Sequence, residues 1–432
     1  MSRRALLVAL ALVPAISACG DEMQPSGPPG GSGAPPGDSI AQLDVAFCRA
    51  LAPRWVAFQD GDGPWTPAQP VDEGRRVRFH HGFSAKHGAV ATVSLLPAGM
   101  TALSIQYGAV AELAAAGDTT STGCADGGFV TVLGNVAKLD AGELAVVTTG
   151  FASQEVFGPA PDPLELSLPS SPQDIIATRA RVARDSVVVT GFILRRGVAV
   201  VDGATLPVFD FDASEAFQPT IRTLTITGRG NDHVVAAMGV RTARTQSGLL
   251  AFQPDSTTVT QPYYAIPTSG LVSSDVQFLA ARAMSTTPGA VRRATVYFHS
   301  PADVTLAFAA EVALPEVSVA ASAPTLRPRA RFARQADYDR LTMITYRADG
   351  TVVSVAMTDA YATLSGNGYD LVVPELRGVP GFDVSWALRP ASGVNWSVVR
   401  IGGTLGLGPD AVPTDGAIQR AAELSGTTPA SR

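Results

Sequence analysis

PLELSLPSSPQDIIATRAR, residues 163–181, is the stretch that decides the fold. Leu164, Leu166 and Leu168 alternate with polar residues, and this period of two places the three leucines on one face of a half-buried strand. Pro169 removes a backbone donor, so the strand ends there, and the Ser-Ser-Pro that follows favours a turn. A second alternating run comes next. The stretch therefore predicts two β-strands joined as a hairpin.

Three looser copies of this stretch occur along the chain, at residues 93–107, 263–282 and 370–389. The prolines that precede the turns of the four copies are Pro97, Pro169, Pro267 and Pro374. Their spacings of 72, 98 and 107 residues are the lengths of small sandwich domains. We therefore expect an all-β chain of tandem β-sandwich modules. The alternative is a β-propeller, which would need regular repeats of blade length.

The copies at residues 95–99 and 164–179 resemble a hairpin of carboxypeptidase-regulatory-like (transthyretin-like) and Cna-B-like sandwich modules. In each, an apolar strand, a Leu-Pro-x-Gly-type turn and an alternating strand follow one another. The resemblance implies Ig-like or transthyretin-like sandwiches that act as spacers or binding units. Some Cna-B-like modules carry an internal Lys–Asn isopeptide bond. This chain has only two lysines, Lys86 and Lys138, too few for one such bond in every module.

Turn signals and strand-like runs divide the chain into seven parts. They are a signal peptide (1–18), a disordered tether (19–43), a β module with a disulfide (44–126), three β-sandwiches (127–213, 214–313 and 314–404) and a polar tail with a short helix (405–432). Thr414 or Asp415 is expected to cap that helix, which would run through Leu424, and the last residues should be frayed.

The composition limits the classes of partner. Charged residues make up 16% of the chain and the net charge is −6, which argues against nucleic acid as the main partner. Gly (42) and Pro (32) are plentiful, as expected for short strands and many turns. The one basic cluster, four arginines within residues 327–334, is interpreted as the solvated face of a strand.

The N-terminus carries the most specific motif. A basic segment and a short apolar core within residues 1–18 form an export signal. Residues 16–19, Ile-Ser-Ala-Cys, resemble a bacterial lipobox, whose cysteine becomes the lipidated first residue of the mature protein. The resemblance implies lipidation of Cys19 and a cell-envelope location. Gly20 at the next position favours the outer membrane or the periplasmic face. Residues 20–38 are rich in Gly, Pro and Ser, so they should form the tether.

Two further cysteines, Cys48 and Cys124, bracket a span close to one small module. An exported chain meets an oxidising compartment, so we expect these two cysteines to form a disulfide. In the loop-entropy model such a bond stabilises the fold by about 4 kcal/mol, less any strain.

The segment WVAFQDGDGPW, residues 55–65, contains two candidate ligand-binding residues, Asp60 and Asp62. Its Asp-Gly pairs predict a hairpin turn, because Asp-Gly supplies the positive φ that such turns need. Two other interpretations stay open: a calcium loop, although the third ligand and the distal glutamate are missing, and the Asp-box of sialidase-type propellers. Three nearby histidines are interpreted as surface residues: His80, His81 and His87.

Two tryptophans near the C-terminus are the other candidate binding residues. Trp386 and Trp396 are expected to pack in the core or on a hairpin. They would form a sugar-stacking platform only if both rings were exposed on one surface. No G-x-S-x-G elbow, H-E-x-x-H, Walker loop or C-x-x-C is present, so we expect no catalytic residues, no metal and no cofactor.

The sequence therefore favours a lipid-anchored envelope protein in which a β-sandwich array has a structural, ligand-binding or partner-binding role. The alternative is a glycan-active hydrolase or a carbohydrate-binding protein of the cell surface. A third class is an envelope-assembly or solute-carrier lipoprotein, for which a large apolar groove would be the distinguishing feature. The partners expected are a membrane, a glycan or another envelope protein.

Overall fold

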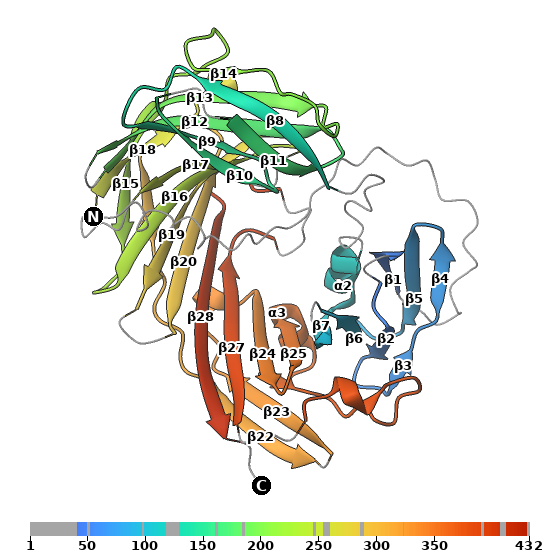
Figure 1. Cartoon of the computed structure of the whole chain (residues 1–432). Helices are drawn as coiled ribbons and strands as arrows, with labels where there is room; N and C mark the ends of the chain where they lie inside the picture. Colours follow the sequence, from blue (N-terminus) through green and yellow to red (C-terminus); the bar gives the residue numbers. More distant parts are fainter. Residues whose placement is uncertain are drawn as a thin grey trace.

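The computed structural model describes residues 41–49, 52–96, 99–117, 129–159, 163–183, 186–244, 248–253, 260–285, 289–322, 324–389, 393–406 and 412–429. These residues form six β-sheets and a few short helices, so the all-β prediction is confirmed. The sheets are not arranged as the radial blades of a propeller, and the propeller alternative is wrong for the described part of the chain. Figure 1 shows four sandwich modules, with the second above the third and the first beside the fourth.

The second and third modules share one strand order. The second comprises β8 (Phe129–Ala137), β9 (Glu143–Thr148), β10 (Ser153–Phe157), β11 (Pro163–Pro169), β12 (Gln173–Ala183), β13 (Ser186–Val198) and β14 (Phe209–Asp210). The third comprises β15 (Thr220–Thr227), β16 (His233–Arg241), β17 (Gly248–Gln253), β18 (Thr260–Ala265), the 3-10 helix η4 (Thr268–Gly270), β19 (Val276–Met284), β20 (Val291–Phe298) and β21 (Val304–Ala307). In both modules the third, second, fifth and sixth strands form one sheet in that order, while the fourth, first and seventh form the other. The first and seventh strands are parallel in both.

The fourth and first modules are variants of this order. The fourth comprises β22 (Glu316–Ser322), β23 (Thr325–Phe332), η5 (Ala336–Tyr338), β24 (Leu341–Ala348), β25 (Thr351–Thr358), α3 (Asp359–Leu364), β26 (Tyr369–Val372), η6 (Val384–Trp386), β27 (Gly393–Gly403) and β28 (Ile418–Pro429). The first comprises β1 (Ala41–Cys48), β2 (Trp55–Asp60), β3 (Trp65–Pro67), β4 (Pro70–Glu73), β5 (Arg76–Phe83), β6 (His87–Leu95), β7 (Thr101–Ala109) and α2 (Val110–Gly117). Both keep the four-stranded sheet, as β25-β24-β27-β28 and β3-β2-β6-β7. In the fourth module β22 takes the place of the seventh strand.

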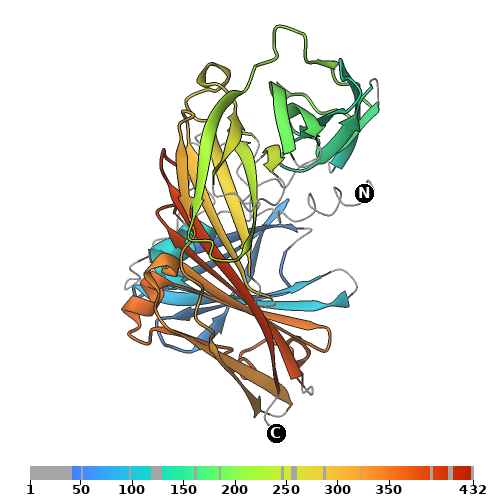
Figure 2. The same ribbon diagram turned by 90° about the vertical axis from the view of Figure 1, so that its left-hand side faces the viewer.

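Three of these four-stranded sheets are fused into one sheet of twelve strands. Strand β20 of the third module pairs with β28 of the fourth, antiparallel, and β25 of the fourth pairs with β7 of the first, parallel. In both views β28 runs through the middle of this sheet, between the third module and the rest of the fourth (Figures 1 and 2). The modules are therefore joined by backbone hydrogen bonds as well as by linkers.

The predicted hairpin at residues 163–181 is not a hairpin. Both strands form, and Leu164, Leu166 and Leu168 are buried as their alternation predicts. However, β11 pairs with β8 in the three-stranded sheet, whereas β12 pairs with β9 and β13 in the four-stranded sheet. The turn at Pro172 thus carries the chain from one layer of the sandwich to the other. Alternation of apolar and polar residues predicts a strand, but it does not determine which other strand pairs with it.

The three looser copies form three different structures. The copy at residues 263–282 also crosses between layers, from β18 to β19. The copy at residues 93–107 is a true hairpin of β6 and β7. In the copy at residues 370–389, the strand expected around Trp386 is wrong, because that residue lies in the 3-10 helix η6. The four copies are therefore not equivalent parts of the modules.

The expected helix in the polar tail is also wrong. Residues 418–429 form β28, which is the sixth strand of the fourth module and pairs with both β20 and β27. Ala421, Ala422 and Glu423 are good helix formers, yet these three residues lie within the two ladders. Tertiary pairing here outweighs local propensity.

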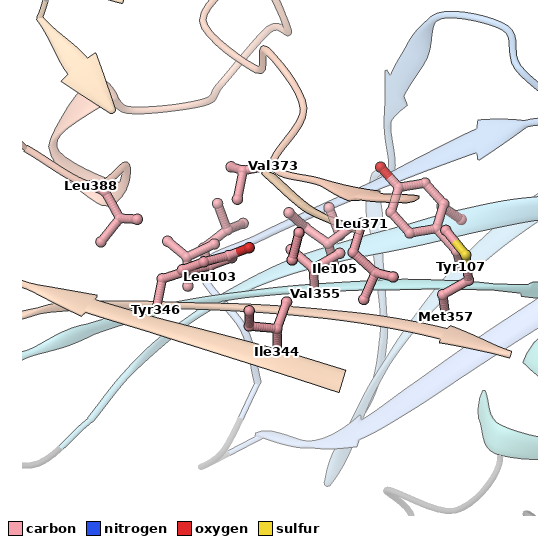
Figure 3. Packing of buried hydrophobic residues seen from close by; sticks show 14 of the residues in the cluster. Leu103, Ile105, Tyr107, Ile344, Tyr346, Val355, Met357, Leu371, Val373 and Leu388 are labelled. Carbon is pink, nitrogen blue, oxygen red and sulfur yellow. The ribbon is translucent and has the colours of Figure 1, made fainter. Parts of the chain in front are cut away.

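One core unites the first and fourth modules. It contains Leu103 and Ile105 of β7, Ile344 of β24, Val355 of β25 and Leu371 of β26, all at most 1% exposed. Figure 3 shows these side chains pointing toward one another from opposite ends of the sequence. Because neither module encloses this core alone, the two modules form one folding unit.

Buried charges join the second and third modules. Arg196, at the end of β13, donates to both carboxylate oxygens of Asp275, at 3.1 and 2.5 Å, and Asp275 is fully buried. Asp174, at the start of β12, accepts hydrogen bonds from Gly197 N at 2.7 Å and from Thr242 Oγ1 at 2.6 Å. The two aspartates occupy equivalent places, because each lies where the chain enters the fifth strand of its module.

Candidate functional site

The Asp-Gly turn forms as predicted and connects β2 to β3. Gly61 has a φ of +56°, which glycine adopts without strain. Asp60 does not point to an open site. Its carboxylate accepts hydrogen bonds from Ala85 N at 2.8 Å, Ser84 N at 2.9 Å and Ser84 Oγ at 2.5 Å. Asp60 therefore fixes the turn between β5 and β6.

The pKa of Asp60 reflects these contacts. Burial alone would raise it, but the hydrogen bonds from Ser84 and Ala85 and the nearby His81 ring together lower the pKa below its ordinary value. Asp62 is different, because its side chain is 69% exposed and lies 3.9 Å from His87 Nε2. Neither aspartate belongs to a group of three or more acidic, histidine or cysteine side chains able to hold a metal within the described ranges. The arrangement supports a turn rather than a calcium loop.

The three histidines are not all surface residues. His80 is partly exposed and pairs with Asp44. His81 is stacked on Phe58, with ring centroids 5.0 Å apart, and its edge meets Phe83 at 4.8 Å. Burial lowers the pKa of His81, although Asp60 opposes this. His81 therefore packs in the first module.

Trp386 packs between the first and fourth modules. Its ring lies 6.5 Å from Trp55 and 5.6 Å from Phe382, and Phe382 itself contacts Trp55 at 5.2 Å. Trp55 Nε1 donates to the carbonyl of Pro380 at 3.2 Å. This aromatic cluster holds the segment between β26 and β27 against β2.

Trp396 packs across a strand pair of the fourth module. It lies on β27 opposite Gly426 of β28, and its Nε1 donates to Thr428 Oγ1 at 3.1 Å. A Cβ at Gly426 would lie 2.4 Å from the Trp396 ring, so the ring covers the glycine. Trp386 and Trp396 are both half-buried against the shared core. Their contacts favour packing over a sugar-stacking platform.

The basic cluster in residues 327–334 is balanced by acidic groups. Arg329 forms a two-point ion pair with Asp370, which Arg331 joins at 3.3 Å. The hydrogen bonds from Arg329, followed by those from Arg331, hold the pKa of Asp370 below its ordinary value despite burial. Arg334 donates to both oxygens of Asp359 at 2.8 Å. These pairs agree with a solvated strand face.

A hollow that the sequence did not indicate lies on the third module. It has a volume of about 480 Å³ and is open to solvent. Its walls come from β15, β18 and the segment before β21, and are lined by Ile221, Arg222, Thr223, Thr260, Gln261, Pro262 and Asp303. The hollow forms where strands from different parts of the chain pair, so no local sequence motif predicts it.

Cys19 and Cys124 lie outside the described residues, so lipidation and the disulfide stay predictions. Cys48 ends β1 and is 9% exposed. No helix within the described ranges combines the length and the apolar character needed to cross a membrane.

No protein-family model matches the chain, and no curated protein matches it significantly. Among solved structures it is similar to the Bacillus anthracis TIE protein, at 8% identity and a TM-score of 0.15, over 74% of this chain and 62% of that one. It is also similar to Escherichia coli alpha-2-macroglobulin activated by porcine elastase, at 6% identity and a TM-score of 0.13, over 89% of this chain and 53% of that one. The chain thus spans less than two thirds of the length of either structure, and at these TM-scores neither indicates a family or an activity.

Proposed function

We propose that this is a lipid-anchored cell-envelope protein whose β-sandwich modules form a rigid array for binding or for structural support. The observation that carries the proposal is the sheet of twelve strands, in which three modules share continuous backbone pairing. Modules that moved independently would be connected by linkers alone. Continuous pairing fixes the relative positions of the modules, which suits a scaffold that holds a surface at a set place.

The contacts of the candidate site residues favour this role over that of a hydrolase. Trp386 serves a joint between modules, and Trp396 covers a glycine within the fourth module. Asp60 holds a turn. The candidate residues that the structure describes thus take part in packing and turn formation, which is the pattern of a framework whose binding surface lies elsewhere.

The anchor is tested with Cys19→Ala in the native host. We expect the wild-type protein to incorporate labelled palmitate and to sediment with membranes, because acyl chains hold a protein by about 0.8 kcal/mol per buried CH₂. Cys19→Ala should lose both the label and the membrane association. Ser26→Ala is the control, since it changes a residue after the lipobox and leaves every cysteine in place, and it should keep both. Equal labelling of the Cys19→Ala protein and the wild type would contradict the anchor.

A further inference from the structure

The open hollow on the third module has the chemistry of a binding site for a neutral, hydroxyl-rich ligand. We propose that it binds saccharide units of a neutral glycan. The proposal rests on the binding role proposed above and assigns that role a site and a ligand class. The volume of about 480 Å³ lies within the range of small-molecule sites. Because the hollow is open, it can take part of a longer chain whose ends extend into solvent.

Two charged groups of the hollow are held in place by the backbone. Asp303 Oδ1 accepts a hydrogen bond from Thr223 N at 2.9 Å, which fixes the carboxylate beside β15. Arg222 Nη1 donates to the carbonyl of Ile221 at 3.0 Å. Tyr263, which pairs with Arg222 across the two strands, is 1% exposed, and its hydroxyl donates to the carbonyl of Ala302 at 2.5 Å. Backbone hydrogen bonds therefore fix Asp303 and the strand pair that lines the hollow.

The lining offers both donors and acceptors to a ligand. Within the described part of the chain no ion pair joins Arg222 to Asp303, and the side chains of Thr260 and Gln261 make no hydrogen bond. A guanidinium needs acceptors, a carboxylate needs donors, and an amide or a hydroxyl serves either. Sugar hydroxyls both donate and accept, so they are complementary to donors and acceptors alike. The apolar surfaces of Ile221 and Pro262 suit the C–H faces of a sugar ring.

The charges of the lining favour no ligand that carries a net charge of one sign. Arg222 and Asp303 contribute one charge of each sign, so the hollow has no net charge from its lining. An anionic ligand would meet the Asp303 carboxylate and a cation would meet the Arg222 guanidinium, each an unfavourable pairing. A neutral ligand is repelled by neither group.

The second module provides a natural comparison. There Thr131 N donates to Asp202 Oδ1 at 3.2 Å, the same contact that Thr223 makes with Asp303. Thr131 faces Ser167 across the strand pair, where Thr223 faces Pro262. The residue before Thr131 is Val130, whereas the third module has Arg222. The second module therefore repeats the backbone support without the guanidinium.

The proposal is tested by isothermal titration of the purified full-length protein in detergent with three neutral oligosaccharides: maltohexaose, cellohexaose and xylohexaose. We expect at least one to bind. Arg222→Ala and Asp303→Ala should each weaken that binding by at least about tenfold, because each removes a charge-assisted hydrogen bond. Asp202→Ala is the matched control. It removes the equivalent support in the second module and should leave the dissociation constant unchanged.

Arg222 is exposed, so its replacement should leave the melting temperature unchanged and separates binding from folding. No binding of any of the three oligosaccharides would overturn the proposal, as would equal binding by the wild type, Arg222→Ala and Asp303→Ala. Either result leaves the membrane anchor to be judged separately by the fate of Cys19→Ala. Equal palmitate labelling of Cys19→Ala and the wild type, with saccharide binding intact, would instead contradict only the proposed location.

Discussion

Asp60 resembles a metal ligand in sequence, but in the structure its carboxylate accepts hydrogen bonds from backbone N–H groups. Its carboxylate joins the turn after β2 to the turn after β5, through Ser84 and Ala85. We expect Asp60→Ala to lower the free energy of unfolding by about 1–3 kcal/mol, because it leaves two backbone N–H groups without their acceptor. Asp62→Ala, two residues away and exposed, should change it by at most about 0.5 kcal/mol. Urea unfolding of the three proteins measures the difference, and equal stability of both variants would refute the turn role.

The lowered pKa of Asp60 also predicts a pH dependence. Because the folded carboxyl has a pKa below its ordinary value of 3.8, the unfolded chain binds more protons in acid. The stabilisation by Asp60 is present above that ordinary value and is lost as the pH falls through the lower folded pKa. We expect the free energy of unfolding to fall less between pH 6 and pH 2 in Asp60→Asn than in the wild type. Parallel pH curves would show that the carboxylate contributes nothing.

Trp396 gives a second test at the residue scale. A methyl group at Gly426 would meet the indole, so Gly426→Ala should destabilise the protein by about 1–3 kcal/mol. Gly378→Ala is the control, because a Cβ there has no neighbour within 4 Å. Thermal unfolding should separate the two variants. If Gly426→Ala melts like the wild type, the ring does not rest on this glycine.

Residue patterns could identify the turn at Asp60 but not its partner. Asp-Gly specifies a positive φ locally, whereas Ser84 lies 24 residues away and reaches Asp60 only through the sheet. The strand predicted around Trp386 is wrong for a related reason. Alternation around this residue matches a strand, yet its ring packs on Trp55 of another module, and the Asp383 side chain caps a 3-10 helix there by accepting from Ser385 N.

At the scale of elements, β28 is the strand on which the large sheet depends. Ending the chain at residue 411 would expose the edges of β20 and β27 together. We expect that protein to bind a hydrophobic dye and to lose cooperative thermal unfolding, because two sheet edges and a core face become open. A chain ending at residue 429, which keeps β28, is the control. Cooperative unfolding of the shorter chain would show that β28 is dispensable.

Element type was more predictable than element partnership. The leucines of β11 specify a strand and a buried face, and both form. Its pairing with β8 rather than β12 depends on the sandwich as a whole. In β28, small residues such as Ala421 and Ala422 fit between two neighbouring strands, and the same residues read in isolation as helix formers.

At the scale of the whole molecule, the ion pair between Arg196 and Asp275 is one of the buried polar contacts that join the second and third modules. Arg196→Ala would leave Asp275 buried without its cation, at a cost of about 3–5 kcal/mol. We expect small-angle scattering to show a changed arrangement of the second module. Arg195→Ala is the control, because Arg195 bonds to the carbonyl of Pro207 and to Glu215, neither of which lies in a strand of the third module. Identical scattering from the two variants would argue against a joint held by charge.

The parallel pairing of β7 with β25 has a consequence for folding during synthesis of the chain. Thr101 pairs with Thr351, so a ribosome adding about 5–20 residues per second makes the two partners on the order of ten seconds or more apart. Throughout that interval β7 has an open edge, and β28 is made later still. The first module therefore cannot complete the edge of β7 until the fourth module has been synthesised.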